Sequence, residues 1–358
     1  MEKMMRAQVL EEPYKFELKE VPVPEITEDD VLVKIKYCGI CGSDWGSYTG
    51  KYADEVECLP LITGHEYCGV IEKVGKNAKG LKEGDRVAVD ICVPCGTCYH
   101  CRIGEPLLCS DFKQLGIHTY GGGFAEYARV PWKNIYKVPD EVSDEKAAFI
   151  EPLTATLNAS KKMGCEIARS VVVIGCGLGI IHAKLAKLRG AAPVILVGDS
   201  AERLQMAKDM GAADFTIDIT TGVDPVAEVM RLTEGRGADF ALEAVGNSKT
   251  YEQAFKMIRR GGKVEAFGIC AEDDFASLPP VEFVIQEKKI SGSTAGIGYD
   301  WADAITLLKY NMIDPTPMIS MIVPLEELVD ALNELQENKK LIKVLVDPSA
   351  KERKILCK

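Results

Sequence analysis

The chain has 358 residues, and since a typical domain has roughly 150 residues, this length predicts two domains, each with its own core. Hydrophobic residues make up 47% and charged residues 27%, a composition that is typical of globular proteins and excludes a disordered or fibrous chain. The 54 acidic and 43 basic side chains leave a formal net charge of −11, which argues against binding to nucleic acid or to an anionic membrane surface.

Neither a secretory signal nor a membrane span is predicted. Residues 1–10 carry charges at Glu2, Lys3 and Arg6 in place of an apolar stretch, and no window of about 18 apolar residues occurs. We therefore expect a cytoplasmic protein that contacts no membrane. In that compartment the 13 cysteines are expected to be metal ligands, buried small residues or catalytic groups rather than disulfides.

The N-terminal part of the chain is rich in predicted β-strands. Alternating apolar residues bounded by glycine and proline predict short strands at 31–38, 69–74, 86–89 and 124–130. This pattern indicates a β-rich domain over residues 1–153.

From about residue 154 onward, predicted strands and helices alternate. Six apolar strand segments are predicted, at 171–174, 194–197, 215–218, 240–243, 263–267 and 289–293. Helical patterns separate the earlier ones, at 182–188, 202–210, 224–233 and 251–258. This alternation predicts an α/β domain over residues 154–296, built on a doubly wound, six-stranded parallel sheet. The remaining residues, 297–358, contain predicted helices at 301–310 and 325–338 and a strand at 341–346, and we expect them to complete the first domain.

Four cysteines occur at short spacing in the first domain. Cys95, Cys98, Cys101 and Cys109 are separated by two, two and seven residues, with glycines between them that let the loop turn. Four thiolates at such spacing predict a closed, tetrahedral, structural zinc site. An iron–sulfur cluster or a redox-active set of thiols is the alternative. Cys92 lies outside this spacing and is expected in the core.

A second set of residues offers mixed ligands. Cys41, His65 and Glu66 combine a thiolate, an imidazole and a carboxylate, the kind of set that catalytic zinc uses when one coordination position stays open for substrate. The alternative for His65 is an ordinary buried histidine. Spacing by itself does not decide between the two.

The motifs around these residues carry a family resemblance. The run Gly64-His65-Glu66-Tyr67-Cys68-Gly69-Val70, the upstream Cys41-Gly42-Ser43-Asp44 and the lobe 95–109 resemble the zinc signatures of the medium-chain, zinc-dependent alcohol dehydrogenases. Glu151-Pro152-Leu153 is similar to the polyol (sorbitol) and threonine dehydrogenase branch. The resemblance implies a GroES-like catalytic domain followed by a Rossmann nucleotide-binding domain.

The resemblance also implies roles for individual residues. Cys41, His65 and Glu66 would bind the catalytic zinc, with Glu151 as an exchangeable fourth ligand. Ser43 would relay the proton of the alcohol. The roles of two further residues are implied in the same way: Asp44 would orient His65, and Lys343 would pair with Glu66.

One position departs from the family pattern. Relatives often place a histidine five residues after the zinc cysteine to pass the proton to solvent, whereas this chain has Gly46. The proton relay must therefore end differently. Nearby aromatic and histidine residues could line a substrate pocket or serve packing, and the sequence leaves this open for Trp45, Tyr48, Tyr52, His118 and Tyr120.

A glycine-rich turn follows the first strand of the α/β domain. Gly175-Cys176-Gly177-Leu178-Gly179 predicts a pyrophosphate site at a helix N-terminus, with a tight turn that binds no ligand as the alternative. The third glycine falls one residue early, because Ile180 stands where G-x-G-x-x-G requires glycine, so the loop is one residue short. Asp199 is the candidate partner of the ribose hydroxyls, although the spacing from Arg203 points to Gly198. The cofactor residues predicted are therefore Gly175, Gly177, Leu178, Gly179, Asp199 and Arg203, and NAD is favoured over NADP.

The function predicted is a zinc-dependent oxidoreductase that transfers a hydride between a secondary alcohol and NAD. The expected alcohols are polyols, diols, cyclitols or hydroxy amino acids. An NADPH-dependent aldehyde or ketone reductase of the same fold, or a cofactor-binding relative without catalysis, are the alternatives. As in relatives, we expect a homodimer or homotetramer assembled through the edge strand 289–294.

Overall fold

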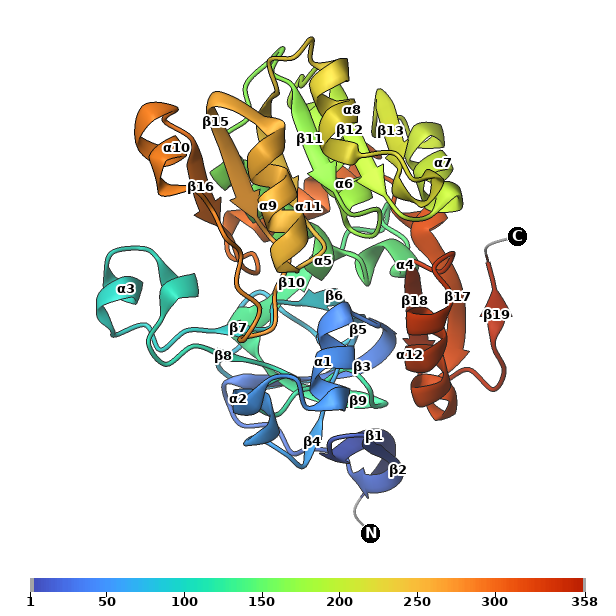
Figure 1. Cartoon of the computed structure of the whole chain (residues 1–358). Coiled ribbons are helices and arrows are strands. Elements are labelled where there is room, and N and C mark those ends of the chain that lie inside the picture. Colours follow the sequence, from blue (N-terminus) through green and yellow to red (C-terminus); the bar gives the residue numbers. More distant parts are fainter. Residues whose placement is uncertain (1–2, 357–358) are drawn as a thin grey trace. The chain divides into compact units, whose positions relative to one another are not determined.

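The computed structural model describes residues 3–356, with the backbone alone at 53 and 54, and its chain divides into two compact units. The first consists of residues 1–152 together with 297–358, and the second of residues 153–296. Figure 1 shows the elements of both. No helix in the described range is long and apolar enough to cross a membrane.

The first unit is built on mainly antiparallel sheets, although one pair of neighbouring strands in the larger sheet is parallel. The larger sheet has eight strands in the order β10-β6-β5-β3-β18-β17-β19, with β9 also paired to β3. A three-stranded sheet has the order β2-β1-β4, and β7 pairs with β8. The strands are β1 (Met4–Glu12), β2 (Lys15–Pro22), β3 (Asp30–Gly39), β4 (Leu61–Ile62), β5 (Glu66–Val74), β6 (Arg86–Val89), β7 (Cys92–Val93), β8 (Lys113–Gln114), β9 (Tyr127–Pro131), β10 (Ile135–Lys137), β17 (Ile319–Pro324), β18 (Lys343–Asp347) and β19 (Lys354–Ile355).

The last part of the chain completes the larger sheet. Strand β18 pairs antiparallel with β3, so that Leu345 lies opposite Gly39 and Val346 opposite Cys38. All five residues of β18 are buried. The helices of this unit are short or flank the sheets: α1 (Gly42–Thr49), α2 (Ala53–Val56), α3 (Tyr99–Arg102), α4 (Asp144–Ala147), α11 (Tyr299–Lys309) and α12 (Leu328–Glu337).

The second unit contains the predicted doubly wound sheet. Its six parallel strands have the order β13-β12-β11-β14-β15-β16. The first three strands are added towards one edge of the sheet, and β14 then pairs with β11 on its other side, from which the remaining strands continue to the opposite edge. The strands are β11 (Val171–Ile174), β12 (Val194–Gly198), β13 (Phe215–Asp218), β14 (Ala238–Glu243), β15 (Ile258–Ala266) and β16 (Lys289–Gly292). The helices are α5 (Ile150–Met163, which begins in the first unit), α6 (Gly179–Leu188), α7 (Ala201–Asp209), α8 (Pro225–Leu232), α9 (Ser248–Met257) and α10 (Pro280–Ile285).

Buried apolar strands form the core of the second unit. Every residue of β11 and β12 is buried, which is the pattern of strands covered on both faces. Side chains from the sheet pack against α8 and α9, which lie side by side in Figure 1. The expected α/β fold is therefore confirmed.

Several element boundaries differ from the prediction. The strand expected at 124–130 begins at Tyr127, because the backbone at Phe124 instead donates to the carbonyl of Thr63. The helix expected at 325–338 begins with a short 3-10 turn and becomes α-helical at Leu328. Strand β15 begins five residues earlier than expected, at Ile258, and passes through a register shift.

Candidate active site

Two neighbouring strands bring the mixed ligand set together. Cys41 follows β3 and is the N-cap of α1, while His65 directly precedes β5 and Glu66 is its first residue. In the β3–β5 pair, Gly39 lies opposite Glu66. The ligand atoms of Cys41, His65 and Glu66 consequently lie within 4.8 Å of one another, and His65 and Glu66 are buried.

Two glycines make this convergence possible. A Cβ atom at Gly39 would overlap the Glu66 carboxylate. Gly64 has φ +93°, and a Cβ there would lie 2.9 Å from the Phe124 ring. Larger residues at either position would displace the ligands or strain the backbone.

Asp44 and Ser43 contact opposite sides of the His65 ring. Ser43 Oγ lies 3.2 Å from Nε2, and Asp44 Oδ1 lies 3.4 Å from Nδ1, which is an ion-pair separation rather than a well-aligned hydrogen bond. Burial lowers the pKa of His65, but the Asp44 carboxylate and the Cys41 sulfur outweigh burial and hold that pKa well above its ordinary value. Asp44 Oδ2 also accepts a hydrogen bond of 2.7 Å from the Cys41 backbone. It therefore caps α1 and faces the imidazole at once.

Glu66 forms a buried ion pair with Lys343. The lysine, at the start of β18, donates to Glu66 Oε1 at 2.8 Å, contacts Oε2 as well, and donates to the Ile40 carbonyl at 2.9 Å. Only 1% of Glu66 and 4% of Lys343 are exposed. A metal bound by Glu66 would thus share this carboxylate with the ammonium group.

Glu151 lies apart from the three-ligand cluster but within its electrostatic field. It stands in the first turn of α5, and its carboxylate is not part of the set of ligand atoms that lie within 4.8 Å of one another in the described residues. Burial raises the pKa of Glu151 to about 7, with His65 lowering it and Glu66 raising it. A carboxyl group of this kind exchanges a proton near neutral pH.

The aromatic residues after Cys41 have different surroundings. Tyr48 stacks on Phe16 with 5.7 Å between ring centroids and also contacts Tyr14 edge-on, so it serves packing. Tyr120 lies beneath the Arg129 guanidinium, 4.0 Å from its carbon. Tyr52 differs from both, because its ring lies directly over Gly46. From the sequence, Tyr52 was only one of several aromatic residues that could line a pocket or serve packing. The position of Tyr52 depends on how the chain turns after α1.

The four-cysteine lobe also gathers its sulfur atoms. Cys95, Cys98, Cys101 and Cys109 have all four sulfurs within 4.8 Å of one another. Backbone N–H groups point at them, including Cys98 to Cys95 Sγ at 3.3 Å and Cys95 to Cys109 Sγ at 3.3 Å. The backbone N–H groups of Cys101 and Ser110 lower the pKa of Cys98 to about 5. The contacts to Cys95 and Cys98 favour the thiolate form that a metal requires.

Both donor sets fit zinc. Tetrahedral zinc with bonds of about 2.0–2.3 Å places its ligand atoms roughly 3.3–3.8 Å apart, which agrees with the clustering of both sets. Sulfur, imidazole nitrogen and carboxylate oxygen leave one position open, whereas four sulfurs form a closed site. Cys92, which the sequence places in the core, is 4% exposed.

The shortened glycine turn keeps three distinct glycine positions. Gly175 has φ +110° and turns the chain after β11. A Cβ at Gly177 would meet nothing within 4 Å, so this backbone is open to a ligand. Gly179 begins α6 and lies close enough to β11 that a Cβ would be 3.2 Å from Val173. In a dinucleotide-binding turn, glycines have three roles: they allow a tight turn, they let the ligand approach the backbone, and they let the helix pack closely on the strand. All three roles occur here in a loop that is one residue shorter.

The acidic residue of the nucleotide site directly follows the second strand. Strand β12 ends at Gly198, whose Cβ would lie 2.6 Å from Cys176 Sγ, and Asp199 is the next residue. The Asp199 carboxylate is 3.7 Å from the Cys176 sulfur, and Cys176 belongs to the glycine turn. Arg203 is in the first turn of α7 and its backbone donates to Ser200. Asp199, at the carboxyl end of β12, therefore lies next to the turn.

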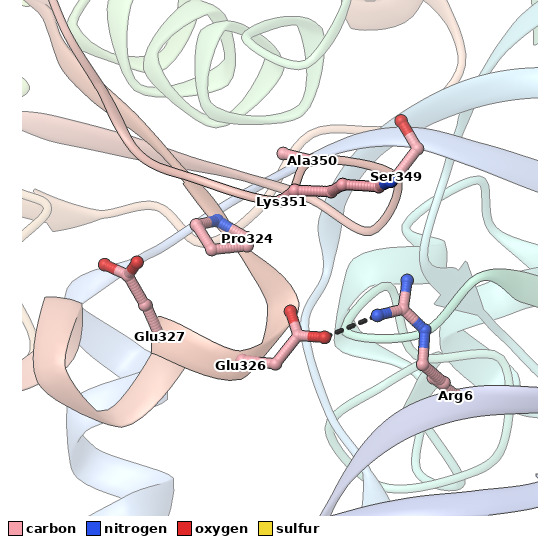
Figure 2. Close-up of a pocket in the computed structure, with 7 residues that line it drawn as sticks. All are labelled: Arg6, Pro324, Glu326, Glu327, Ser349, Ala350 and Lys351. Atoms are coloured by element: carbon pink, nitrogen blue, oxygen red, sulfur yellow. Dashed lines mark hydrogen bonds and ion pairs between the residues drawn. The ribbon is translucent and has the colours of Figure 1, made fainter.

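A separate pocket of about 490 Å³ lies in the first unit between β1, the end of β17 and residues 349–351. Figure 2 shows the Arg6 guanidinium directed at Glu326 across it. Arg6 also pairs with Glu126, and Glu327 pairs with Arg353. None of the predicted site residues lines this pocket, and these charges are neutralised locally.

Comparison with known proteins extends these observations. The alcohol dehydrogenase GroES-like domain matches residues 27–140, and the zinc-binding dehydrogenase family matches residues 177–310. Sorbitol dehydrogenase of Bacillus subtilis (strain 168) is 31% identical over 348 residues, which are 96% of this chain and 98% of that protein. L-threonine 3-dehydrogenase of the same organism is 34% identical over 316 residues, 87% of this chain and 89% of that protein.

A solved structure agrees with the fold as well. The crystal structure of a putative zinc-binding dehydrogenase from Sinorhizobium meliloti 1021 bound to NADP has a TM-score of 0.89 and 30% identity, and the match covers 97% of this chain and 100% of that one. The resemblance expected from the zinc motifs and from Glu151-Pro152-Leu153 is confirmed. With two family matches and relatives aligned over nearly its whole length, the chain belongs to the zinc-binding dehydrogenase family.

Proposed function

We propose that the protein is a zinc-dependent oxidoreductase that transfers a hydride between a secondary alcohol and NAD. The observation that carries the proposal is the convergence of Cys41, His65 and Glu66, with Ser43 against the same imidazole. Relatives named for sorbitol and L-threonine support a substrate that is a polyol, diol, cyclitol or hydroxy amino acid.

The residues of the first unit divide the work at this site. When bound, zinc supplies Lewis-acid polarisation of the alcohol oxygen and the nicotinamide supplies the hydride acceptor. Cys41, His65 and Glu66 would hold the metal, and Glu151 would exchange with water or substrate near it. Asp44 fixes the ring orientation of His65. Ser43 can accept the alcohol proton because its hydroxyl both donates and accepts. Cys95, Cys98, Cys101 and Cys109 would hold a second, structural zinc.

The second unit would bind the dinucleotide at the glycine turn. The open backbone at Gly177 and the start of α6 at Gly179 suit a pyrophosphate, with Gly175 and Leu178 shaping the turn. Asp199 would bind the ribose hydroxyls and repel a 2′-phosphate, and Arg203 lies in the helix that follows. An NADPH-dependent aldehyde or ketone reductase is the second candidate, because the Sinorhizobium meliloti relative was solved with NADP.

Assembly and location extend the proposal. We place a homodimer or homotetramer contact at strand β16, where Ile290 is 41% exposed, together with the neighbouring helix α10, where Val284 is 78% exposed. Exposed apolar side chains at the edge of a sheet are typical of a surface that pairs with another subunit. No disulfide joins the cysteines of the described residues, which supports a cytoplasmic, reducing location. Light scattering on the purified protein measures the assembly state.

One screen tests the proposed reaction. Purified protein is offered polyols, diols, cyclitols and L-threonine with NAD or NADP, and formation of the reduced cofactor is followed before and after treatment with a chelator. We expect turnover with NAD that chelation abolishes, and metal analysis near two zinc ions per chain. Turnover confined to NADPH and aldehydes would select the reductase instead. Absence of turnover with bound NADH would select a cofactor-binding protein without catalysis.

A further inference from the structure

Helix α1 presents polar groups along one face next to the candidate metal ligands. Ser43, Gly46 and Ser47 are three and four positions apart and so share a face. Ser43 Oγ contacts His65 Nε2 at 3.2 Å. Ser47 Oγ lies 3.1 Å from the Ser43 carbonyl and also hydrogen-bonds the buried carboxylate of Glu55. Between the two serines, Gly46 contributes no side chain.

The ring of Tyr52 fills the space that a side chain at residue 46 would take. After α1 the chain turns at Gly50, with φ +70°, and Lys51 N–H donates to the Gly46 carbonyl at 2.9 Å. This turn folds Tyr52 back over the helix. A Cβ atom at Gly46 would overlap Tyr52 Cε2 and lie 2.9 Å from Cζ, the carbon that bears the hydroxyl. The phenol group is therefore beside the helix face that starts with Ser43.

The electrostatic surroundings of Tyr52 agree with this placement. Burial raises the pKa of Tyr52, and the Glu55 carboxylate and the Cys41 sulfur raise it further. The phenol thus stays protonated at neutral pH and lies within electrostatic reach of Cys41. A neutral hydroxyl at this place both donates and accepts hydrogen bonds.

We propose that Tyr52 receives the proton that leaves Ser43 during alcohol oxidation and passes it to solvent, so that a phenol ring over Gly46 forms the end of the proton path. The alcohol O–H bond breaks and its proton binds Ser43 Oγ. The original Ser43 proton moves to Tyr52 Oη through a water molecule that bridges the two hydroxyls, and the phenol proton moves to bulk water, which leaves each hydroxyl neutral. The C–H electron pair leaves as hydride with the nicotinamide, so this inference rests on the proposed function.

The first test removes the hydroxyl and keeps the ring. Tyr52→Phe preserves the packing over Gly46, and we expect kcat to fall on the order of 100-fold, the lower end for a proton-transfer group, with KM changed less than threefold. The solvent deuterium isotope effect on kcat should rise, because proton transfer becomes limiting. Tyr48→Phe, in α1, is the matched control. Its ring packs on Phe16, and we expect its kcat within twofold of the wild type.

A second variant rebuilds the path with another group. Gly46→His alone would drive its side chain into the Tyr52 ring, whereas Gly46→His with Tyr52→Ala places an imidazole in the vacated space. We expect this double variant to exceed Tyr52→Ala in kcat by at least about tenfold, since an imidazole also transfers protons.

A measurement without turnover locates the hydroxyl. In protein labelled with ¹³C at the tyrosine Cζ, the Tyr52 resonance is the one that disappears in Tyr52→Phe. Imidazole is added to the zinc-loaded protein as a ligand for the open metal position. We expect the Tyr52 resonance to shift and that of Tyr48 to stay in place.

The outcomes separate this inference from the proposed function. A wild-type protein inactive on every alcohol with both cofactors overturns the proposed function itself. An active wild type with Tyr52→Phe within twofold of it overturns only the role of Tyr52. Loss of turnover in Tyr52→Phe without an imidazole-induced shift would assign the hydroxyl a structural role away from the metal site, and would overturn its role in proton transfer as well.

Discussion

His182 in α6 offers a stability test that depends on a single buried group. The side chain is 2% exposed, and neither ring nitrogen has a hydrogen-bond partner in the described part of the protein. Its ring meets Phe267 edge-on, with 4.4 Å between centroids. Burial lowers the pKa of His182 to about 3, from 6.5 for an unhindered histidine. The imidazole is therefore neutral in the folded protein throughout the usual pH range.

The sign of the pH effect follows from these two values. Between pH 6.5 and pH 3 the unfolded chain binds a proton at residue 182 that the folded chain does not bind, so the free energy of unfolding decreases as the pH is lowered. From pH 7.5 to pH 5.5, linkage gives a loss of about 1.4 kcal/mol from this one residue. His182→Leu removes the titrating group and two unpartnered nitrogens, so we expect it to be at least as stable as the wild type at pH 7.5.

Urea unfolding of the wild type, His182→Leu and His182→Gln at both pH values measures the effect. The wild type should lose about 1.4 kcal/mol more than either variant. His182→Gln controls for polarity, because its amide is buried like the imidazole but does not titrate. Equal pH-dependent losses in all three proteins would refute the reasoning and show that His182 titrates equally in both states.

Three further predictions concern other parts of the molecule. Lys343→Met leaves the Glu66 carboxylate buried without its ammonium partner, so we expect a loss of about 3–5 kcal/mol in the free energy of unfolding. When Glu66→Gln is added, we expect roughly half that loss. Equal losses in the single and double variants, measured by urea titration, would contradict the ion pair. Gly177→Ala meets no neighbouring atom and should leave the thermal midpoint unchanged while weakening NADH binding on the order of tenfold. Gly175→Ala, at φ +110°, should by contrast cost about 1–3 kcal/mol of stability, and fluorescence titration together with thermal scans tells the two variants apart. Cys98→Ser removes one thiolate of the closed set, so metal analysis should find about one zinc per chain in place of about two, and an unchanged zinc content would show that the lobe binds no metal.

The sequence predicts the doubly wound sheet well because its central strands are short, continuous apolar runs, a pattern that favours buried strands. Val171–Ile174 and Val194–Gly198 are buried throughout, and such runs are read directly from hydrophobicity. The hairpin of β1 and β2 was not predicted in this way, because β2 alternates charged and apolar residues and has no fully buried position. Strand β17 was missed as well, although all of its residues are buried, because Pro317 and Pro324 bound it within a turn-rich segment.

The candidate site was predictable only in part. The spacing of Cys95 to Cys109 and the adjacent His65 and Glu66 are local patterns, and they lead to the clusters that the fold brings together. The Lys343–Glu66 pair joins residues 277 positions apart, and spacing alone carries no such information. The position of Tyr52 depends on the turn at Gly50, so no linear motif reveals that a phenol ring covers Gly46.

The pairing of β18 with β3 sets an order of events during synthesis. The six-stranded unit is contiguous, residues 153–296, and can fold as soon as it leaves the ribosome. The larger sheet of the other unit is completed later, because β3, which pairs with β5 and β9, gains its partner β18 at Cys38 and Gly39 only when Leu345 and Val346 have been made. Until then the Glu66 carboxylate lacks its lysine, and the nascent N-terminal segment keeps an open sheet edge that chaperones or premature partners can reach.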